Sequence, residues 1–312
     1  MTIYSHIPVM LKETIDALSI KPNGTYLDCT FGRGGHSGEI LKLLSDKGRL
    51  IAFDRDLDAV NEGKKIADKR FEIEHCAFSE IDKILKKKNI KKLDGILMDL
   101  GISSPQIDEA RRGFSFRFDA ALDMRMDQTR GITAADIVNT YEEKDLIYAL
   151  KTYGEEKFAK KIVKAVIEYR NTKGPIKMTL ELAELIKNTV PKRGLKKDPS
   201  TKTFQALRIL VNKEIEELEM TLPIVFGYLR PKARLVVISF HSLEDRIVKN
   251  YTKHQIKTDF IPKSIPIKAS EIKLPPFKIV QKMMTPSEKE IEQNPRSRSA
   301  KLRVIEKAME II

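Results

Sequence analysis

The segment from Tyr26 to Ser37, which reads Y-L-D-C-T-F-G-R-G-G-H-S, constrains the fold of this chain most strongly. A short apolar run that is typical of a β-strand leads directly into a loop with Gly32, Gly34 and Gly35. Because glycine has no Cβ atom, such a loop can adopt positive φ angles and bring its N–H groups close to a ligand. The periodic apolar residues between Ile40 and Leu44 then predict a helix. Strand, glycine loop and helix in this order are typical of a nucleotide site.

The next predicted strand, from Arg49 to Asp54, ends in an acid. Asp54 follows Gly32 at close to the roughly 20-residue spacing at which an acid meets the ribose hydroxyls in dinucleotide folds. A strict G-x-G-x-x-G pattern, however, requires glycine where Ser37 stands. An adenosyl ligand without phosphates, namely S-adenosylmethionine (SAM), therefore fits better than NAD. An NAD-dependent oxidoreductase stays open as the weaker alternative.

Composition favours a polyanionic partner. The 312 residues carry 57 Lys and Arg against 44 Asp and Glu, a net charge of +13. This excess indicates nucleic acid, although solvated lysine faces on a soluble protein would give the same count. The length allows one large domain or two modest ones.

The two cysteines indicate a reducing compartment, and the hydropathy of the chain indicates that no segment spans a membrane. Cys29 and Cys76 lie in apolar strand-like runs, so we interpret them as core residues and expect neither a disulfide nor a metal site. No apolar run approaches the roughly 18 residues of a membrane span, and the N-terminus has no signal-peptide core. We expect a cytoplasmic protein with no membrane partner. Its oligomeric state stays open, a homodimer included.

The order of apolar patterns predicts an α/β fold. Strand-like runs alternate with helical ones over residues 25–31, 49–54, 71–78 and 94–100. This alternation is typical of a doubly wound, Rossmann-like parallel sheet. The fourth run ends at Asp99 and opens into a loop that should line the ligand crevice.

Helical periodicity then dominates from about residue 111 to residue 190, with amphipathic helices over 155–170 and 179–190 and a basic turn over 192–197. We predict an inserted helical domain over 111–197 within a sheet domain of residues 1–110 and 198–312. One long helix over 204–222, which Pro223 should end or kink, leads back to the sheet. Three more strands over 234–240, 278–284 and 301–307 should complete it, the last two as an antiparallel pair. An irregular surface loop should cover 253–276.

Longer sequence motifs identify a family. The chain resembles the RsmH (MraW) family, which are class I SAM-dependent methyltransferases with a Rossmann-like sheet, over its whole length. The residues that carry the resemblance include G-R-G-G-H-S from Gly32, D-G-I-L-M-D-L-G-I-S-S-P-Q from Asp94, R-G-F-S-F from Arg112, L-D-M-R-M-D from Leu122, and S-F-H-S-L-E-D-R from Ser239. The resemblance implies N4-methylation of a specific cytidine in the decoding region of 16S rRNA, within the small ribosomal subunit.

By the same resemblance, the SAM contacts fall on Gly34, Gly35, His36, Asp54, Phe78, Asp99 and Gln106. Asp54 would accept the ribose hydroxyls, and Phe78 would lie against the adenine. One departure is visible, because Asp198 to Thr201 reads D-P-S-T where the family usually has His-Pro-Ala-Thr. This chain therefore has no imidazole at that place, and the difference affects none of the predicted cofactor contacts.

The loop after the fourth strand suggests how the exocyclic N4 amine of the target cytosine is held. We predict that Asp99 and the backbone carbonyls of Ser103, Ser104 and Pro105 accept hydrogen bonds from the amine, with Ser239 and His241 completing the pocket. The loop lacks the aromatic residue that many amino-methyltransferases have there, so Phe114 or Phe116 is expected to stack on the base.

Phosphate contacts are predicted for Arg112, Arg125, Arg296, Arg298 and Arg303, with structural ion pairs as the alternative interpretation. A DNA amino-methyltransferase and a non-catalytic RNA-binding protein remain alternatives.

Overall fold

The computed structural model describes residues 8–191, 198–256 and 275–309, which form two compact units. The sheet unit comprises Met1–Gly101 and Glu216–Ile312, and the helical unit comprises Ile102–Ile215. The predicted insertion, 111–197, falls within the helical unit. The basic turn over 192–197 and most of the predicted loop over 253–276 lie outside the described residues.

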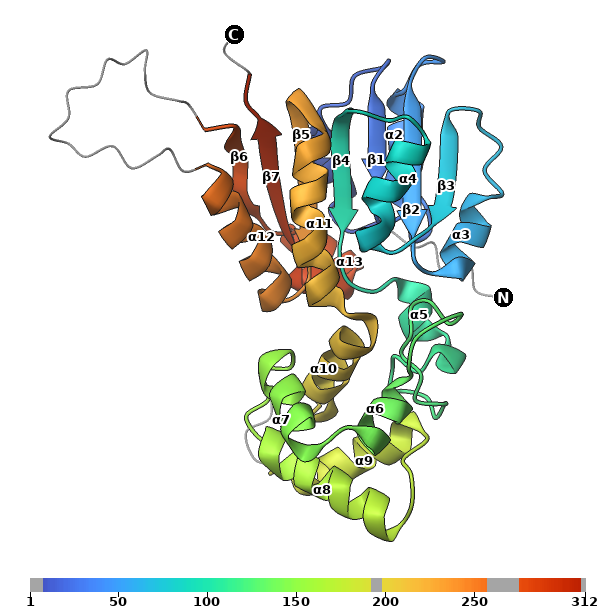
Figure 1. Cartoon of the computed structure of the whole chain (residues 1–312), viewed down its shortest axis with the longest axis vertical. Helices are drawn as coiled ribbons and strands as arrows, with labels where there is room; N and C mark the ends of the chain where they lie inside the picture. The colour runs from blue at the N-terminus through green and yellow to red at the C-terminus, as the bar shows by residue number, and fades with distance from the viewer. Residues whose placement is uncertain (1–7, 192–197, 257–274, 310–312) are drawn as a thin grey trace, which may run out of the picture. The chain divides into compact units, whose positions relative to one another are not determined.

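A seven-stranded sheet forms the centre of the sheet unit (Figure 1). The strand order is β3-β2-β1-β4-β5-β7-β6, and the first five strands in this order are parallel. β7 is antiparallel to both of its neighbours. The predicted doubly wound sheet and its closing antiparallel pair are therefore confirmed. The strands are β1 (Thr25–Asp28), β2 (Arg49–Asp54), β3 (Phe71–His75), β4 (Leu93–Asp99), β5 (Leu229–Ser239), β6 (Phe277–Met284) and β7 (Lys301–Lys307).

Helices cover both faces of this sheet. Because side chains alternate along a strand, Leu27 and Ile51 pack in one apolar core, whereas Tyr26 and Leu50 pack in the other. The first core is closed by α4 (Ile81–Lys87), α11 (Glu214–Tyr228) and α12 (Ser242–Gln255), and Figure 1 shows α4 and α11 in front of the strands. The second is closed by α1 (Leu11–Leu18), α2 (Gly35–Leu43) and α3 (Leu57–Gly63). Burial on both faces explains why these strands read as continuous apolar runs.

The single long helix predicted over 204–222 is wrong. Lys213 has a left-handed backbone with φ of 50° and separates α10 (Ser200–Asn212) from α11. Its N–H bonds to the carbonyl of Leu210, which closes the last turn of α10. Pro223 does not end α11, which continues to Tyr228 because residues on both sides of the proline, including Leu222 and Val225, are buried in the core.

The helical unit contains α5 (Ser104–Asp108), the short 3₁₀ helix η2 (Ala110–Arg112), α6 (Ala134–Thr140), α7 (Glu143–Thr152), α8 (Ala159–Thr172), α9 (Thr179–Thr189) and α10. The predicted amphipathic helices correspond to α8 and α9, and their apolar stripes are buried, as at Ile162 and Leu182. α8 begins later than predicted, since Glu155 has a positive φ of 49° and Glu156 accepts the N–H of Phe158.

Small elements complete the sheet unit: the 3₁₀ helices η1 (Phe78–Glu80) and η4 (Pro295–Ser299), and α13 (Glu288–Gln293). Across the described ranges of both units, no helix has the length and apolar content that crossing a bilayer requires.

Candidate functional site

The parallel strand order reverses between β1 and β4, and ligands of doubly wound sheets bind at such a switch point, outside the carboxyl ends of the strands. Three adjacent strands end in an acid at this edge: β1 in Asp28, β2 in Asp54 and β4 in Asp99. Three carboxyl groups therefore gather at the place where the sequence predicted the cofactor.

Asp54 holds the glycine loop. Its Oδ2 accepts the backbone N–H of Gly32 at 2.8 Å, and its Oδ1 accepts the N–H of Asp56 at 2.8 Å. Gly32 and Gly34 have φ of 57° and 75°, and a Cβ on Gly34 would lie 2.7 Å from the Phe31 ring. Glycine is required there, since side-chain residues rarely adopt this conformation and the space is filled. Each carboxylate oxygen keeps a second lone pair, so Asp54 can also accept ribose hydroxyls.

Asp28 is a site residue that the sequence reasoning missed. It is fully buried, and its Oδ2 accepts the Ser37 hydroxyl at 2.6 Å while its Oδ1 accepts the Thr30 N–H at 3.0 Å. Thr30 Oγ1 in turn accepts the backbone N–H of Asp99 at 2.7 Å, which joins the ends of β1 and β4. The signal in the sequence was an acid inside an otherwise apolar strand.

Asp99 presents an acceptor at the switch point. Its Oδ1 is buried, and no residue in 8–191, 198–256 or 275–309 gives it a hydrogen bond. Its Oδ2 lies 3.7 Å from Nδ1 of His36, too far for a good hydrogen bond. His36 sits in the first turn of α2, and its Nε2 lies 3.2 Å from the carbonyl of Val9. A buried acceptor without a partner is expensive unless a ligand supplies the donor.

Burial is the main reason why all three acids have a raised pKa. Burial raises the pKa of Asp28 and, with help from the charges of Asp28 and Glu244, raises that of Asp99 well above its usual value. Burial also raises the pKa of Asp54 to about 6, although the N–H groups of Asp56 and Gly32 oppose the shift. A cation bound among these groups would favour their charged forms. SAM carries a sulfonium and an ammonium group, so the residues present fit this cofactor.

Phe78, predicted to lie against the adenine, is the first residue of η1 and is half-buried. Its ring packs partly against the core beside α4 and α11. A contact with the adenine remains a prediction for this residue.

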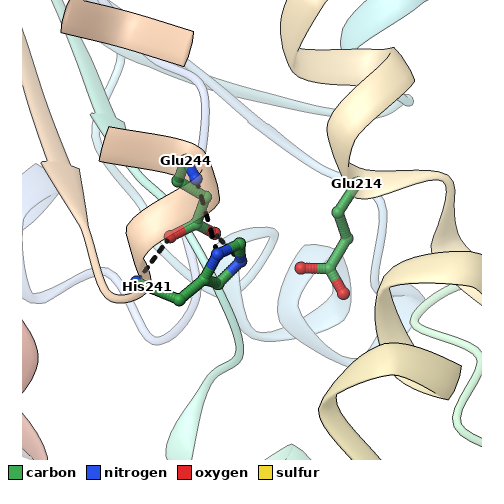
Figure 2. A group of neighbouring side chains, drawn as sticks. All are labelled: Glu214, His241 and Glu244. Carbon is green, nitrogen blue, oxygen red and sulfur yellow. Dashed lines mark hydrogen bonds and ion pairs between the residues drawn. The ribbon is translucent and has the colours of Figure 1, made fainter. Parts of the chain in front are cut away.

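Ser239 is the last residue of β5, and His241 lies between β5 and α12. The Ser239 hydroxyl is buried and points to the carbonyl of Lys301 at 3.4 Å. His241 caps α12, with its Nδ1 3.4 Å from the N–H of Glu244 and its Nε2 3.1 Å from Glu244 Oε1 (Figure 2). Both side chains thus have structural contacts, and their part in the pocket stays a prediction. Glu214, also drawn in Figure 2, belongs to the helical unit, where it forms a bidentate ion pair with Arg208.

The predicted loop residues after β4 belong to the helical unit. Gln106 is buried, and its Oε1 accepts the N–H of Ser103 at 3.0 Å. The carbonyl of Ser103 accepts the N–H of Ile107 at 3.4 Å, and that of Pro105 accepts the N–H of Glu109 at 2.8 Å. These bonds around Ser104 fix the backbone of α5. The carbonyls of Ser103 and Pro105 each keep one lone pair for a substrate amine.

Several predicted RNA contacts have structural roles instead. Arg112 is buried and donates to the carbonyls of Arg125 and Met126, so its predicted phosphate contact is wrong. Arg125 pairs with Asp123 at 2.8 Å and Arg303 pairs with Asp245 at 2.7 Å.

Of the two aromatic predictions, the one for Phe114 is wrong, whereas base stacking by the half-buried Phe116 stays a prediction. Phe114 is buried beside the Arg112 guanidinium, and the ring of Phe116 packs edge-on against Phe204 at 4.9 Å. Arg296 and Arg298, in η4, are exposed, and a phosphate contact remains a prediction for both.

Known proteins resemble this chain over almost its whole length. A model of the MraW methylase family matches residues 3–308. A ribosomal RNA small subunit methyltransferase H from Methylobacillus flagellatus is 51% identical over 97% of this chain and 94% of that protein. The protein of the same name from Dechloromonas aromatica is 48% identical over 97% of this chain and 98% of its own length. Among solved structures, an rRNA methylase from Streptococcus thermophilus matches with a TM-score of 0.40 and 8% identity, over 96% of this chain and 94% of that one.

The glycine loop, the acids at the strand ends and the matches across the chain agree, and the protein belongs to the MraW methylase family.

Proposed function

We propose that this protein transfers the methyl group of SAM to the exocyclic N4 of a cytidine in the decoding region of 16S rRNA, acting on the small ribosomal subunit in the cytoplasm. The observation that carries the chemical part is the buried Oδ1 of Asp99, an acceptor without a partner in the described ranges, at the switch point of the sheet. An amine that enters this position can donate a hydrogen bond to Asp99 Oδ1.

Cytosine N4 is a weak nucleophile, because its lone pair is delocalised into the ring. Bound SAM supplies a methyl group activated by the adjacent positive sulfur. Asp54 and the glycine loop would orient the adenosyl part, and positioning of this kind can supply much of the rate. As the N–C bond forms and the C–S bond breaks, positive charge develops on N4. Asp99 Oδ1, kept in its charged form by the bound cation, would stabilise that charge and accept the departing proton.

The helical unit is proposed to recognise the RNA. Lys160, Lys161 and Lys164 lie exposed on α8, while Ile162 and Val166 on the same helix are buried. An exposed lysine face on a helix anchored by its apolar side suits contact with phosphates. The target base must be unstacked to reach a sheet-edge site, and RNA readers commonly act on such unpaired nucleotides.

Isotope-labelled methyl transfer tests this function. The protein is incubated with labelled SAM and either small subunits, naked 16S rRNA or DNA of the same sequence, and the products are digested to nucleosides and identified by mass spectrometry. We expect N4-methylcytidine from small-subunit RNA and none from DNA. Label on cytosine C5 or on a ribose oxygen would overturn the proposal. C5 chemistry needs a thiolate, and Cys29 and Cys76 are buried, with the pKa of Cys29 raised well above its usual value by burial.

A further inference from the structure

The segment after Arg112 contains three phenylalanines, and only one is exposed. Phe114 is buried and Phe116 packs on Phe204, whereas Phe118 keeps 48% of its surface exposed. An exposed aromatic ring lacks the free energy that burial of its apolar surface would provide. A partner that stacks on the ring would supply that free energy.

The backbone that carries Phe118 is held firmly within the helical unit. Its carbonyl accepts the Thr179 hydroxyl at 2.7 Å, and the same Oγ1 accepts the N–H of Ala120 at 3.1 Å. Ala121 pairs with Met178 in an antiparallel bridge. A ring on such a fixed support loses little further entropy when it stacks on a planar group.

Each of the two paired segments carries an exposed cation, near Phe118 in the first and near Met178, the bridge partner of Ala121, in the second. Arg117 precedes Phe118 and is exposed, and Lys177, next to Met178, is exposed as well. An aromatic platform beside Lys and Arg side chains is the usual arrangement for gripping single-stranded nucleic acid, in which bases stack and phosphates meet the charges.

We propose that Phe118 stacks on an unpaired base of the RNA substrate, with Arg117 and Lys177 contacting the adjoining phosphates. This inference rests on the proposed function. Phe118 is a substrate-binding residue in this role and takes no part in the transfer itself.

The chain contains no tryptophan, so Phe118→Trp creates a protein with a single fluorescent indole at the proposed platform. Tyr148→Trp is the matched control, because Tyr148 is another aromatic of the helical unit and is 62% exposed. Both are titrated with small-subunit RNA in the absence of SAM. We expect the indole at 118 to be quenched and that at 148 to be unaffected. Bound RNA with unchanged emission at 118, or equal quenching at both positions, overturns the inference.

Kinetics give a second, independent readout. Phe118→Ala should raise the KM for RNA about 5- to 150-fold, the range expected for loss of one stacked base, with kcat and SAM affinity within about twofold. Phe118→Tyr should restore the parental KM. Thermal unfolding of each variant separates this effect from a folding defect. If the parent protein fails to methylate small-subunit RNA, the proposed function fails. If the parent is active and Phe118→Ala keeps its KM, only the stacking role fails.

Discussion

The backbone N–H of Gly32 donates to Asp54 Oδ2 at 2.8 Å, so the acid that ends β2 also shapes the loop that follows β1. Its second oxygen holds the N–H of Asp56. One carboxylate therefore fixes the glycine loop and offers its remaining lone pairs to a ribose. Cofactor affinity and loop geometry should change together when this residue is replaced.

Asp54→Ala is expected to weaken SAM binding at least tenfold. The change removes a charged acceptor, and hydrogen bonds to charged groups contribute roughly 1.5–3 kcal/mol each. Asp54→Asn, which keeps one acceptor oxygen, should lose less. Calorimetric titration measures both, with Asp46→Ala as a control at an exposed acid of the same unit. Unchanged affinity in Asp54→Ala would remove this residue from the site.

Cofactor affinity should also depend on pH through Asp54, whose pKa is raised to about 6 by burial. The ionised form is the one that accepts hydrogen bonds with both oxygens, so affinity should fall as the pH drops through this value. At pH 5 only about a tenth of the molecules would be ionised, which predicts a loss of roughly tenfold relative to pH 8. Titrations between pH 5 and 8 measure the step, and Asp54→Asn should lack it. A step of equal size in that variant would assign the titration to another group.

Asp99→Ala should abolish methyl transfer, whereas Ser104→Ala should cost much less. Removal of one aimed polar group that acts in the transition state typically lowers the rate roughly 100-fold or more. The fold should survive, because Thr30 binds the backbone N–H of Asp99 and not its carboxyl. Single-turnover rates with saturating SAM give the comparison, and circular dichroism checks the fold. Turnover within about threefold of the parent in Asp99→Ala would exclude it as the group that holds the amine.

Neutralising Lys160, Lys161 and Lys164 with glutamine should weaken RNA binding and flatten its dependence on salt, since fewer counterions are released when fewer cations meet phosphates. SAM affinity should not change. The matched control replaces Lys83, Lys87 and Lys91, which are exposed in and just after α4 and alter the net charge equally. Binding isotherms at several salt concentrations decide the matter. Equal slopes in the two triple variants would show a general charge effect and no specific role for α8.

Local patterns were sufficient to predict the sheet and the acids at its carboxyl edge. Apolar runs predicted all seven strands, the spacing from the glycine loop singled out Asp54, and the end of the fourth run singled out Asp99, because period and spacing are properties of the chain itself. The same reasoning missed Asp28 and Thr30, whose roles come from hydrogen bonds to Ser37 and to the neighbouring strand.

Tertiary structure decided which similar side chains are used inside the protein and which stay outside. Phe114, Phe116 and Phe118 alternate in one short segment, yet the first two are packed within the helical unit and the third is exposed. Arg112 was predicted to meet phosphate and is buried against backbone carbonyls. The sequence determines which groups can bury apolar surface or donate a hydrogen bond. Only the packing of distant segments determines which of them find a partner, because burial and satisfied hydrogen bonds depend on neighbours that sequence spacing does not reveal.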